Sequence, residues 1–299
     1  MSSYASRRRK YFAVSFISAF LVFWLVFLLL MSAGQTSSPP GSAVGLASTP
    51  ATAAAAYQPR EEDALTLLVF GTEHPGAVAD TFLLLRFDPV AGQVGVAVFP
   101  PGTVLTHNES GETLAEAFRF GGALYTRTAL EQTLNIPIDR HARITTQGFI
   151  AAAAAVGTVE FELYDALHIH TEGQLITLNP GVHLLDGRQA AELIRYRGHP
   201  GGEAGRIALI TRLVCAVIDQ RIDVVHSTLL EQIFATVINL VETDITYAYF
   251  ERRVDGARLM ASSGYPVALP IILQGAFCED YTRFTLADTA LAALSRVFL

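Results

Sequence analysis

Lysine is almost absent from this 299-residue chain: the single one is Lys10. Every later basic residue is an arginine, which indicates a compositional bias of the genome and not a choice of arginine at each position. Acidic residues outnumber basic ones by 28 to 21, giving a formal net charge of −7. A surface of that sign repels the phosphates of nucleic acids. The protein is therefore not expected to bind DNA or RNA.

Cysteine is also scarce, with only Cys215 and Cys278. The two could form one disulfide; two separate buried thiols are the alternative, and the one we expect. Several common active-site motifs are missing, because no Gly-x-Ser-x-Gly, P-loop or Gly-x-Gly-x-x-Gly occurs. His168 and His170 would share one face of a strand, but the further ligands of a zinc site do not follow at the usual spacing. Zinc is therefore not expected.

Charge is missing from residues 11–31, which follow four basic residues at 7–10. As a helix, this apolar run would span about 31 Å, close to the roughly 30 Å of a bilayer core. A cleaved signal peptide usually has a shorter apolar stretch. We therefore expect an uncleaved, single-pass signal anchor in a cell membrane, with residues 1–10 in the cytoplasm and the C-terminal domain outside it. Cleavage near 32–34 and a buried core helix are the alternatives.

Residues 32–62 are rich in Ser, Pro, Ala and Gly and show no periodic apolar face. This composition predicts a flexible linker with an r.m.s. reach of about 30 Å. The following domain, 63–299, would therefore work close to the outer face of the membrane. It is apolar, patterned and long enough to bury one sizeable core.

Within this domain, strand and helix patterns alternate, which predicts an α/β fold. Continuous apolar runs bounded by Gly or Pro predict strands, and apolar residues at helical spacing predict helices. Strands are expected at 65–71, 81–89, 93–101 and 140–146, with the second and third joined as an antiparallel hairpin. Helices are expected at 113–134, broken by Gly121 and Gly122, then through the alanines 151–155, at 186–194 with Asp186 as N-cap, and at 205–222.

Four arginines fall within 18 residues, far more than an even spread would give: Arg195, Arg197, Arg206 and Arg212. A guanidinium presents a planar fork of donors that pairs with two phosphate oxygens. If the chain is extended after Ile194, Arg195 and Arg197 point to the same side. Arg206 would then start a helix whose N-terminus also favours an anion. We expect this cluster to hold a phosphate or pyrophosphate; surface ion pairs with the many carboxylates are the alternative.

Four stretches, in order along the chain, are similar to motifs of one known family. They are LLVFGTEHPGAVADTFLLLRFDPVAGQVGVAVFPPGT, LEQTLNIPIDRHARITTQGF, LNPGVHLLDGRQAAELIRYR and EAGRIALITR. Together they resemble the LytR–CpsA–Psr family of membrane-anchored, extracytoplasmic proteins of Gram-positive envelopes. The similarity covers about residues 63–222, with a looser match to the end.

The resemblance implies an α-β-α fold, in which helices flank a mixed central sheet. It also implies the transfer of a glycopolymer, such as teichoic acid or capsule, from a polyprenyl-pyrophosphate carrier to peptidoglycan. Such a site would need an apolar tunnel for the lipid and a divalent metal such as Mg²⁺ to neutralise phosphate charge. By position, Asp80 matches the metal-linked aspartate of the family, and Glu203 is a second candidate metal ligand. Arg195, Arg197 and Arg206 match its phosphate-holding arginines and complete the expected catalytic set with Asp80.

The chain also departs from the family pattern. The family's Pro-Arg-Asp-Thr is replaced by Pro-Pro-Gly-Thr, and other polar positions have become small or apolar. The changed positions are Val78, Ala79, Pro101, Gly102, Ala154, Leu209 and Ile210. Arg212 could partly replace the lost arginine. These changes predict that phosphate binding is kept and turnover is weak or lost. An active transferase, a relative that binds a polyprenyl phosphate or wall polymer without transferring it, and an anchored protein-binding domain all stay open.

Overall fold

The computed structural model describes residues 57–299, except 108–109, 172–173 and 265. The predicted cytoplasmic segment and membrane span, and most of the predicted linker, therefore lie outside the described residues. Among the residues that are described, no helix is long and apolar enough to cross a membrane.

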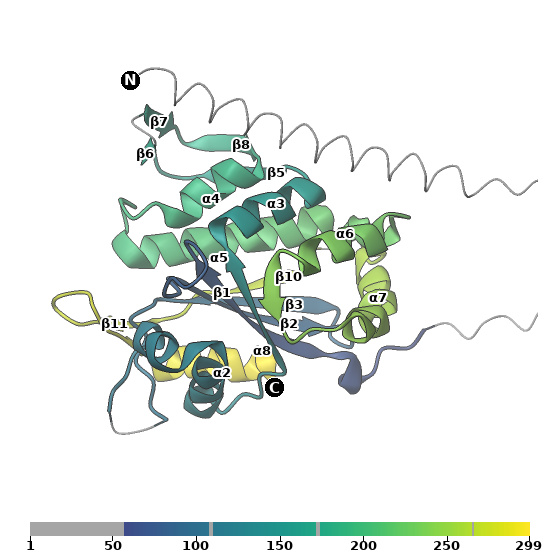
Figure 1. Cartoon of the computed structure of the whole chain (residues 1–299), viewed down its shortest axis with the longest axis horizontal. Coiled ribbons are helices and arrows are strands. Elements are labelled where there is room, and N and C mark those ends of the chain that lie inside the picture. The colour runs from purple at the N-terminus through teal and green to yellow at the C-terminus, as the bar shows by residue number, and fades with distance from the viewer. Residues whose placement is uncertain (1–56, 108–109, 172–173, 265) are drawn as a thin grey trace, which may run out of the picture. The chain divides into compact units, whose positions relative to one another are not determined.

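A six-stranded mixed sheet forms the centre of the domain, in the order β10-β3-β2-β1-β4-β9 (Figure 1). Its strands are β1 (Leu65–Thr72), β2 (Thr81–Asp88), β3 (Gln93–Phe99), β4 (Arg140–Thr145), β9 (Val241–Thr243) and β10 (Ala268–Ile271). β2 runs antiparallel to both β1 and β3, and β4 runs parallel to β1. The four strands expected from the sequence are therefore confirmed, together with the hairpin that joins the second and third.

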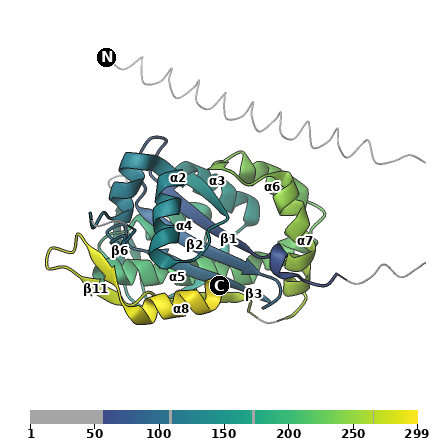
Figure 2. The same cartoon turned by 90° about the horizontal axis from the view of Figure 1, so that it is seen from below.

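Helices cover both faces of this sheet (Figure 1 and Figure 2). On one face lie α2 (Leu114–Leu134) and α8 (Asp288–Phe298), and on the other lie α3 (Thr146–Val156), α4 (Gly187–Arg195) and α5 (Gly202–Arg221). α6 (Leu230–Ile238) and α7 (Tyr247–Ala261) lie together at one end, and the short 3-10 helices η1 (Glu61–Asp63) and η2 (Ile222–His226) complete the helices described. This arrangement confirms the α-β-α layering.

The two faces of the sheet differ in burial. Along β1, Leu68 and Phe70 are fully buried in a core that faces α2 and α8, and Leu84 of β2 joins them. Successive side chains of a strand point to opposite faces. The intervening Val69 and Leu83 therefore point toward α3, α4 and α5, and they are only half-buried. One face is a closed core, and the other is partly open.

Local signals place the helix ends. At the start of α2, the Glu116 N–H donates to Thr113 Oγ1 at 3.3 Å, and the Thr113 N–H donates to Glu116 Oε2 at 2.8 Å, a capping box. Gly122, with φ of 67°, breaks α2 where the paired glycines predicted a break. At α4, the Gln189 N–H donates to Asp186 Oδ1 at 2.8 Å, which confirms Asp186 as the N-cap.

Two short antiparallel sheets of two strands each pack on α4 and α5. β5 (Val159–Leu163) pairs with β8 (Gly181–Leu185), and β6 (Leu167–Thr171) pairs with β7 (Gln174–Leu178). Their buried residues form a second core with Leu193 of α4 and Leu213 of α5. Because this core lies on the far side of α4 from the sheet, it holds α4 in place without filling the open face.

The two cysteines lie in different environments. Cys215 is buried on α5, where burial raises the pKa of its thiol to about 12. Cys278 lies just after β11 (Gly275–Phe277), which pairs with β12 (Phe284–Leu286), and it is exposed. Both are free thiols. The expectation that both would be buried is wrong for Cys278, because the β11–β12 hairpin carries it on the surface.

Candidate functional site

A pocket of about 880 Å³ lies between the open face of the sheet and helices α3, α4 and α5. Apolar side chains from all four elements form its wall: Val69, Leu83, Ile144, Phe149, Ile150, Ala191, Ile194, Ile210 and Val214. A concave site of this size, lined by apolar groups with a few polar ones, is typical of a small-molecule or cofactor site. The open face of the sheet therefore carries the candidate site.

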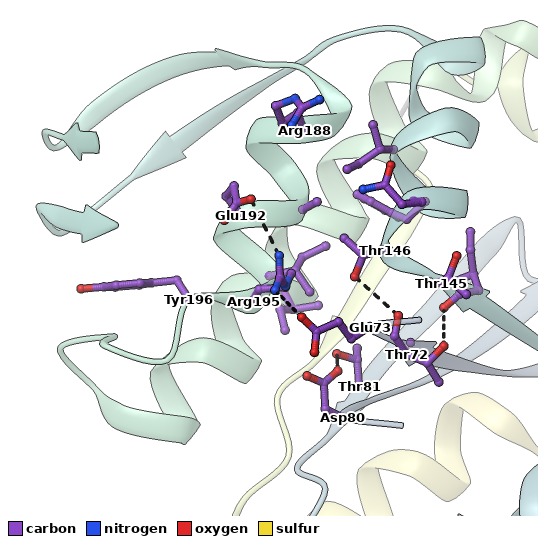
Figure 3. Close-up of a pocket in the computed structure, with 18 of the residues that line it drawn as sticks. Thr72, Glu73, Asp80, Thr81, Thr145, Thr146, Arg188, Glu192, Arg195 and Tyr196 are labelled. Carbon is purple, nitrogen blue, oxygen red and sulfur yellow. Dashed lines mark hydrogen bonds and ion pairs between the residues drawn. The ribbon is translucent and has the colours of Figure 1, made fainter. Parts of the chain in front are cut away.

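Polar side chains line the pocket where β1 and β2 meet α4 (Figure 3). β1 ends at Thr72 and Glu73 follows it, while Asp80 stands directly before β2. Gly71 makes this close turn possible, because a Cβ there would lie 2.9 Å from the Cβ of Thr81. The Asp80 N–H also donates to Gly71 O at 3.1 Å. The turn thereby places two carboxylates, Glu73 and Asp80, on one rim of the pocket.

Arg195 and Arg197 face these carboxylates. Arg195 Nη2 lies 2.9 Å from Glu73 Oε1, and Arg197 Nη2 lies 3.0 Å from Asp80 Oδ2. The side chains of the two arginines are 43% and 59% exposed, so a ligand in the pocket can reach both. The structure thus brings Asp80, Arg195 and Arg197 together, as the sequence predicted, and adds Glu73 to them.

The backbone that carries these arginines is not the extended segment expected after Ile194. Arg195 is the last residue of α4, and the extended conformation starts only at Tyr196, with φ of −66° and ψ of 115°. The expectation was wrong because α4 continues while its apolar side is still buried, through Leu193 and Ile194. Arg195 therefore reaches the rim from a helix end, and Arg197 reaches it from the loop beyond.

Arg206 is in a different environment, since its side chain is only 1% exposed. Its Nε donates to Glu203 Oε2 at 2.9 Å, and its Nη2 donates to Glu203 Oε1 at 2.6 Å. Nη1 donates to Ile194 O at 3.0 Å and Nη2 to Asp80 O at 3.2 Å. Arg206 lies inside α5, not at its start as expected, and it does not line the pocket. It joins the backbone of Asp80 to that of Ile194, next to Arg195, and so positions the rim.

Glu203 and Asp80, the two carboxylates expected to bind metal, also differ in their surroundings. Both oxygens of Glu203 accept hydrogen bonds from Arg206. Asp80 lies at the pocket, with Oδ1 accepting from Thr81 Oγ1 at 3.2 Å and Oδ2 facing Arg197. The described part of the chain has no cluster of three or more His, Cys, Asp or Glu that could hold a metal by itself. Mg²⁺ commonly takes one or two carboxylates and completes its shell with phosphate and water. Asp80 and Glu73 fit that arrangement, and Glu203 does not.

The glycine-rich loop between Arg197 and Arg206 adds no positive charge of its own. Burial lowers the pKa of His199, and Arg212 and Arg206 lower it further, against an opposing effect of Asp165. The imidazole is therefore neutral at pH 7. The positive charge of this segment comes from its arginines alone.

Arg212 does not take the place of the arginine that the family has and this chain lacks. Its guanidinium stacks over the ring of Tyr164 at 3.9 Å and donates to Glu162 O at 3.0 Å. It therefore holds the β5–β8 region on α5 and does not line the pocket. The interpretation of Arg212 as a partial replacement is wrong, because one turn along α5 brings it to β5 and away from the pocket.

Two of the departures from the family pattern have structural consequences. At Gly102, an added Cβ would lie 2.2 Å from Thr282 O, and Gly102 O accepts from the Phe284 N–H at 2.8 Å. The segment leading into β12 therefore occupies the space that an aspartate side chain would need. Ile210, at the glutamine position, is 1% exposed and belongs to the pocket wall. The change at Ile210 therefore makes the pocket wall more apolar, whereas Gly102 lines neither described cavity.

Two rim residues were missed in the sequence. Glu73 could have been found, because it ends the Gly-Thr-Glu stretch that follows the first strand. Arg188 lines the pocket from the first turn of α4 and is exposed, with no ion pair to another described residue. Its spacing to Glu192 and Arg195, four and seven residues on, places all three on one helix face.

A family model described as the LytR_cpsA_psr family matches residues 41–263, most of the chain. The chain belongs to this family. Among its relatives, TagU of Oceanobacillus iheyensis is 27% identical over 197 residues, which are 62% of this chain and 60% of the relative. That relative is named polyisoprenyl-teichoic acid–peptidoglycan teichoic acid transferase. The matched stretch thus spans less than two thirds of the relative's own length.

Solved structures of LytR_cpsA_psr proteins share the fold. TagV of B. subtilis superposes with a TM-score of 0.64 at 20% identity, covering 80% of this chain and 97% of TagV. A structure of TagT bound to LIIa-WTA superposes with a TM-score of 0.60 at 17% identity, covering 79% of this chain and 89% of TagT. The resemblance noted in the sequence is therefore confirmed for family and fold.

Proposed function

We propose that this domain binds a glycopolymer carried on a polyprenyl phosphate or pyrophosphate and acts, with weakened turnover, in its transfer to peptidoglycan. The observation that carries the proposal is that one pocket combines an apolar wall with a rim of two arginines and two carboxylates. The name of the TagU relative and the WTA ligand in the TagT structure support this class of substrate and acceptor.

The apolar wall would take the polyprenyl chain. Val69, Leu83 and Ile144 are half-buried around the empty volume, so a chain bound there would remove further apolar surface from water. Each buried methylene contributes about 0.8 kcal/mol, so the lipid would supply most of the affinity. An affinity that comes mainly from the lipid would let the site distinguish the lipid carrier from soluble phosphates.

The rim would take the phosphate through an exchange of ion pairs. Arg195 and Arg197 each face one carboxylate, at 2.9 and 3.0 Å. Both pairs are partly exposed, and pairs of this kind contribute only about 0–1 kcal/mol. A phosphate that accepts from both guanidiniums can therefore replace the carboxylates at little cost, because charge-assisted contacts to it are stronger.

A divalent cation such as Mg²⁺ would complete the exchange. When the arginines turn to the phosphate, Glu73 and Asp80 lose their partners, and their charge then adds to that of the phosphate. Mg²⁺ bound by these carboxylates would supply the positive charge that lets both anionic groups share the rim. The cation and the phosphate are therefore expected to bind more tightly together than alone.

Weakened turnover follows from the groups that are missing. Transfer needs donors placed where charge develops on the leaving phosphate, and the loss of one such donor typically costs about 10²–10³ in rate. In this chain, Gly102 and Ile210 stand where other family members carry polar side chains. Binding, which needs fewer placed groups, is retained by Arg195 and Arg197.

Membrane anchoring is part of the proposal. The uncharged run 11–31 and the basic residues at 7–10 support a single-pass anchor with the domain outside the cytoplasm. Protease added to intact, wall-stripped cells should digest the C-terminal domain and spare a tag fused to Met1. A protected domain, or a mature chain that begins near residue 34, would argue against the anchor.

The second candidate is a family member that binds the lipid-linked polymer without transferring it. The packing of Thr282 and Phe284 against Gly102 favours this candidate, because that contact leaves no room for a catalytic side chain. A domain that binds only proteins is the third. The third predicts no affinity for a polyprenyl pyrophosphate, whereas the second predicts affinity without transfer.

One experiment separates these functions. The full chain, in detergent or nanodiscs, is titrated with a polyprenyl pyrophosphate and then assayed for glycan transfer to peptidoglycan. Arg195→Ala with Arg197→Ala should weaken binding roughly 100-fold, since each charge-assisted contact contributes about 1.5–3 kcal/mol. Arg258→Ala is the matched control, because Arg258 forms an exposed ion pair with Asp255 at 3.2 Å and lines neither pocket described.

Wild type should bind the lipid and transfer slowly. If wild type does not bind it, or if the double variant binds as well as wild type, the proposed site is wrong. Transfer at the rate of a family member that has the complete Pro-Arg-Asp-Thr motif would instead remove the claim of weakened turnover.

A further inference from the structure

A second cavity, of about 540 Å³, lies on the other face of the sheet, beside the kink of α2. The residues that line this cavity show which face of the sheet it lies on, because they include Phe118 and Ala123 of α2 and His141 of β4. The ring of His141 packs edge-to-face on Phe70, which belongs to the closed core on that side. We call this space the α2 cavity.

The α2 cavity and the first pocket share one loop. The connection from β1 to β2 places Glu73 and Asp80 on the rim of the first pocket, and its middle, Gly76 to Val78, lines the α2 cavity. A transferase must hold a donor and an acceptor next to each other. Since the donor is assigned to the first pocket, the α2 cavity lies where a second substrate could approach the reacting phosphate.

The α2 cavity carries charges of both signs. Arg143 forms an ion pair with Glu242, whose side chain is 69% exposed. Asp244 is more fully engaged, because it accepts from Arg127 at 3.1 Å and from the backbone N–H of His141 at 2.8 Å. Arg119 also lines the cavity, is exposed, and has no ion pair to another described residue. Arg119 and Oε2 of Glu242, the oxygen that does not pair with Arg143, thus offer a cation and an acceptor in the same cavity.

The break in α2 shapes this arrangement. Gly122 adopts φ of 67° and ψ of −164°, so the helix is interrupted between Arg119 and Ala123. A Cβ built on Gly122 meets no atom within 4 Å, which leaves that side of the kink open. A continuous helix would carry Arg119 and Ala123 on one face, four residues apart, with backbone between them fully hydrogen-bonded. The kink instead places Gly122 itself in the lining of the cavity.

We propose that the α2 cavity binds the acceptor, through the peptide part of peptidoglycan. This inference rests on the proposed function. A peptide that carries a free amine and carboxylates is complementary to a cavity with both signs of charge, whereas a polyphosphate or a neutral glycan is not. Arg119 pairs with a carboxylate of the peptide, and Glu242 pairs with its amine. The attached sugar then lies over the β1–β2 loop, toward Asp80.

The test uses the full chain and a soluble disaccharide-peptide fragment of peptidoglycan, titrated by NMR or calorimetry. The same disaccharide without its peptide and a polyprenyl pyrophosphate are the two comparison ligands. Arg119→Ala should weaken binding of the disaccharide-peptide about tenfold, in line with the loss of one charge-assisted contact. It should leave the affinity for the polyprenyl pyrophosphate unchanged. Glu242→Gln should give a smaller loss of the same kind.

Arg296→Ala is the control, because Arg296 is an exposed helical arginine that lines neither cavity and has no ion pair to another described residue. The proposal is overturned if wild type binds the fragment no better than the peptide-free disaccharide, or if Arg119→Ala binds it as tightly as wild type. In both cases retained binding of the polyprenyl pyrophosphate would leave the proposed function intact. Loss of that binding in wild type would instead count against the proposed function itself.

Discussion

The two faces of the central sheet come from the same strands, but one packs into a closed core and the other lines a pocket. Toward α2 and α8, Leu68, Phe70 and Leu84 are 0% exposed and belong to one continuous core. Toward α3, α4 and α5, their sequence neighbours Val69 and Leu83 line a pocket of about 880 Å³. In the sequence the two sets look alike, since both consist of apolar strand residues. What separates them is the helix layer that covers each.

α4 shows how that difference arises. On its side toward the β5–β8 and β6–β7 sheets, Leu193 is buried in the second core. On its side toward the sheet, it presents Arg188, Glu192 and Arg195 to the pocket. Charged groups are costly to bury, so they stay at the partly exposed rim, while Ala191 and Ile194 of the same helix line the apolar wall. α4 therefore borders the pocket and does not seal it.

The side chain of Arg206 is almost fully buried behind the rim of the pocket. Its removal should therefore have the largest effect on the stability of the domain. Arg206→Ala leaves Glu203 without its partner and breaks the link between the backbones of Asp80 and Ile194. Loss of one member of a buried ion pair typically costs about 3–5 kcal/mol. Chemical denaturation should show that loss. Arg195→Ala, at the exposed rim, should change stability by less than about 1 kcal/mol; equal losses would contradict the assignment of Arg206 as a positioning residue.

Adjacent leucines of β2 give a matched test of the two faces. Leu84→Ala removes a side chain that is 0% exposed and should destabilise the domain by about 2–5 kcal/mol. Leu83→Ala should cost roughly half as much or less, because its side chain is only half-buried beside the open pocket. In lipid titrations the order should reverse, with only Leu83→Ala weakening binding of a polyprenyl pyrophosphate. Equal destabilisation by both would mean that the pocket face is packed like the core.

The sequence predicted those parts of the structure that local signals determine. The apolar runs of β1 to β4, the break at Gly122 and the N-cap at Asp186 all follow from residues within a few positions. The role of Arg206 could not be predicted in this way, since Asp80, to which it donates, lies 126 residues earlier. The end of α4 was predicted one residue early for a similar reason, because the burial of Leu193 depends on two short sheets formed by other parts of the chain.

The sequence predicted most of the charged residues that form the candidate site, but not which of them pair with one another. Asp80, Arg195 and Arg197 meet at the rim, while Glu73 and Arg188 were found only in the structure. The pairing of each arginine with a carboxylate depends on how α4 approaches the β1–β2 loop, and no spacing in the sequence reports that approach.

The paired rim predicts a coupling between cation and phosphate. Saturating Mg²⁺ should tighten binding of a polyprenyl pyrophosphate by roughly 5- to 150-fold, the usual range of such coupling. By linkage, the lipid should tighten Mg²⁺ binding by the same factor. Calorimetric titration in both orders measures this. Asp80→Asn should reduce the coupling; an unchanged affinity with and without Mg²⁺ would show that the carboxylates do not hold the cation.

The smallest effect is expected at Arg188, two turns before Arg195 on α4. It is exposed and without an ion pair to another described residue, so Arg188→Ala should not alter stability measurably. It should weaken binding of a lipid-linked anionic glycan by a few-fold, in keeping with an exposed charge contact of up to about 1 kcal/mol. The bare polyprenyl pyrophosphate should bind this variant as it binds wild type. A loss that is equal for both ligands would place Arg188 at the pyrophosphate instead.

The central claim, that the open face of the sheet is a lipid-phosphate site, is tested most directly by native mass spectrometry of the full chain loaded with polyprenyl pyrophosphate. Wild type should retain one lipid and prefer long-chain over short-chain forms, because each buried methylene contributes about 0.8 kcal/mol. Val69→Trp, which fills the pocket from the sheet, should lose the lipid while melting at the same temperature as wild type. Retention of the lipid by Val69→Trp at the wild-type level, or no preference for chain length, would contradict the account.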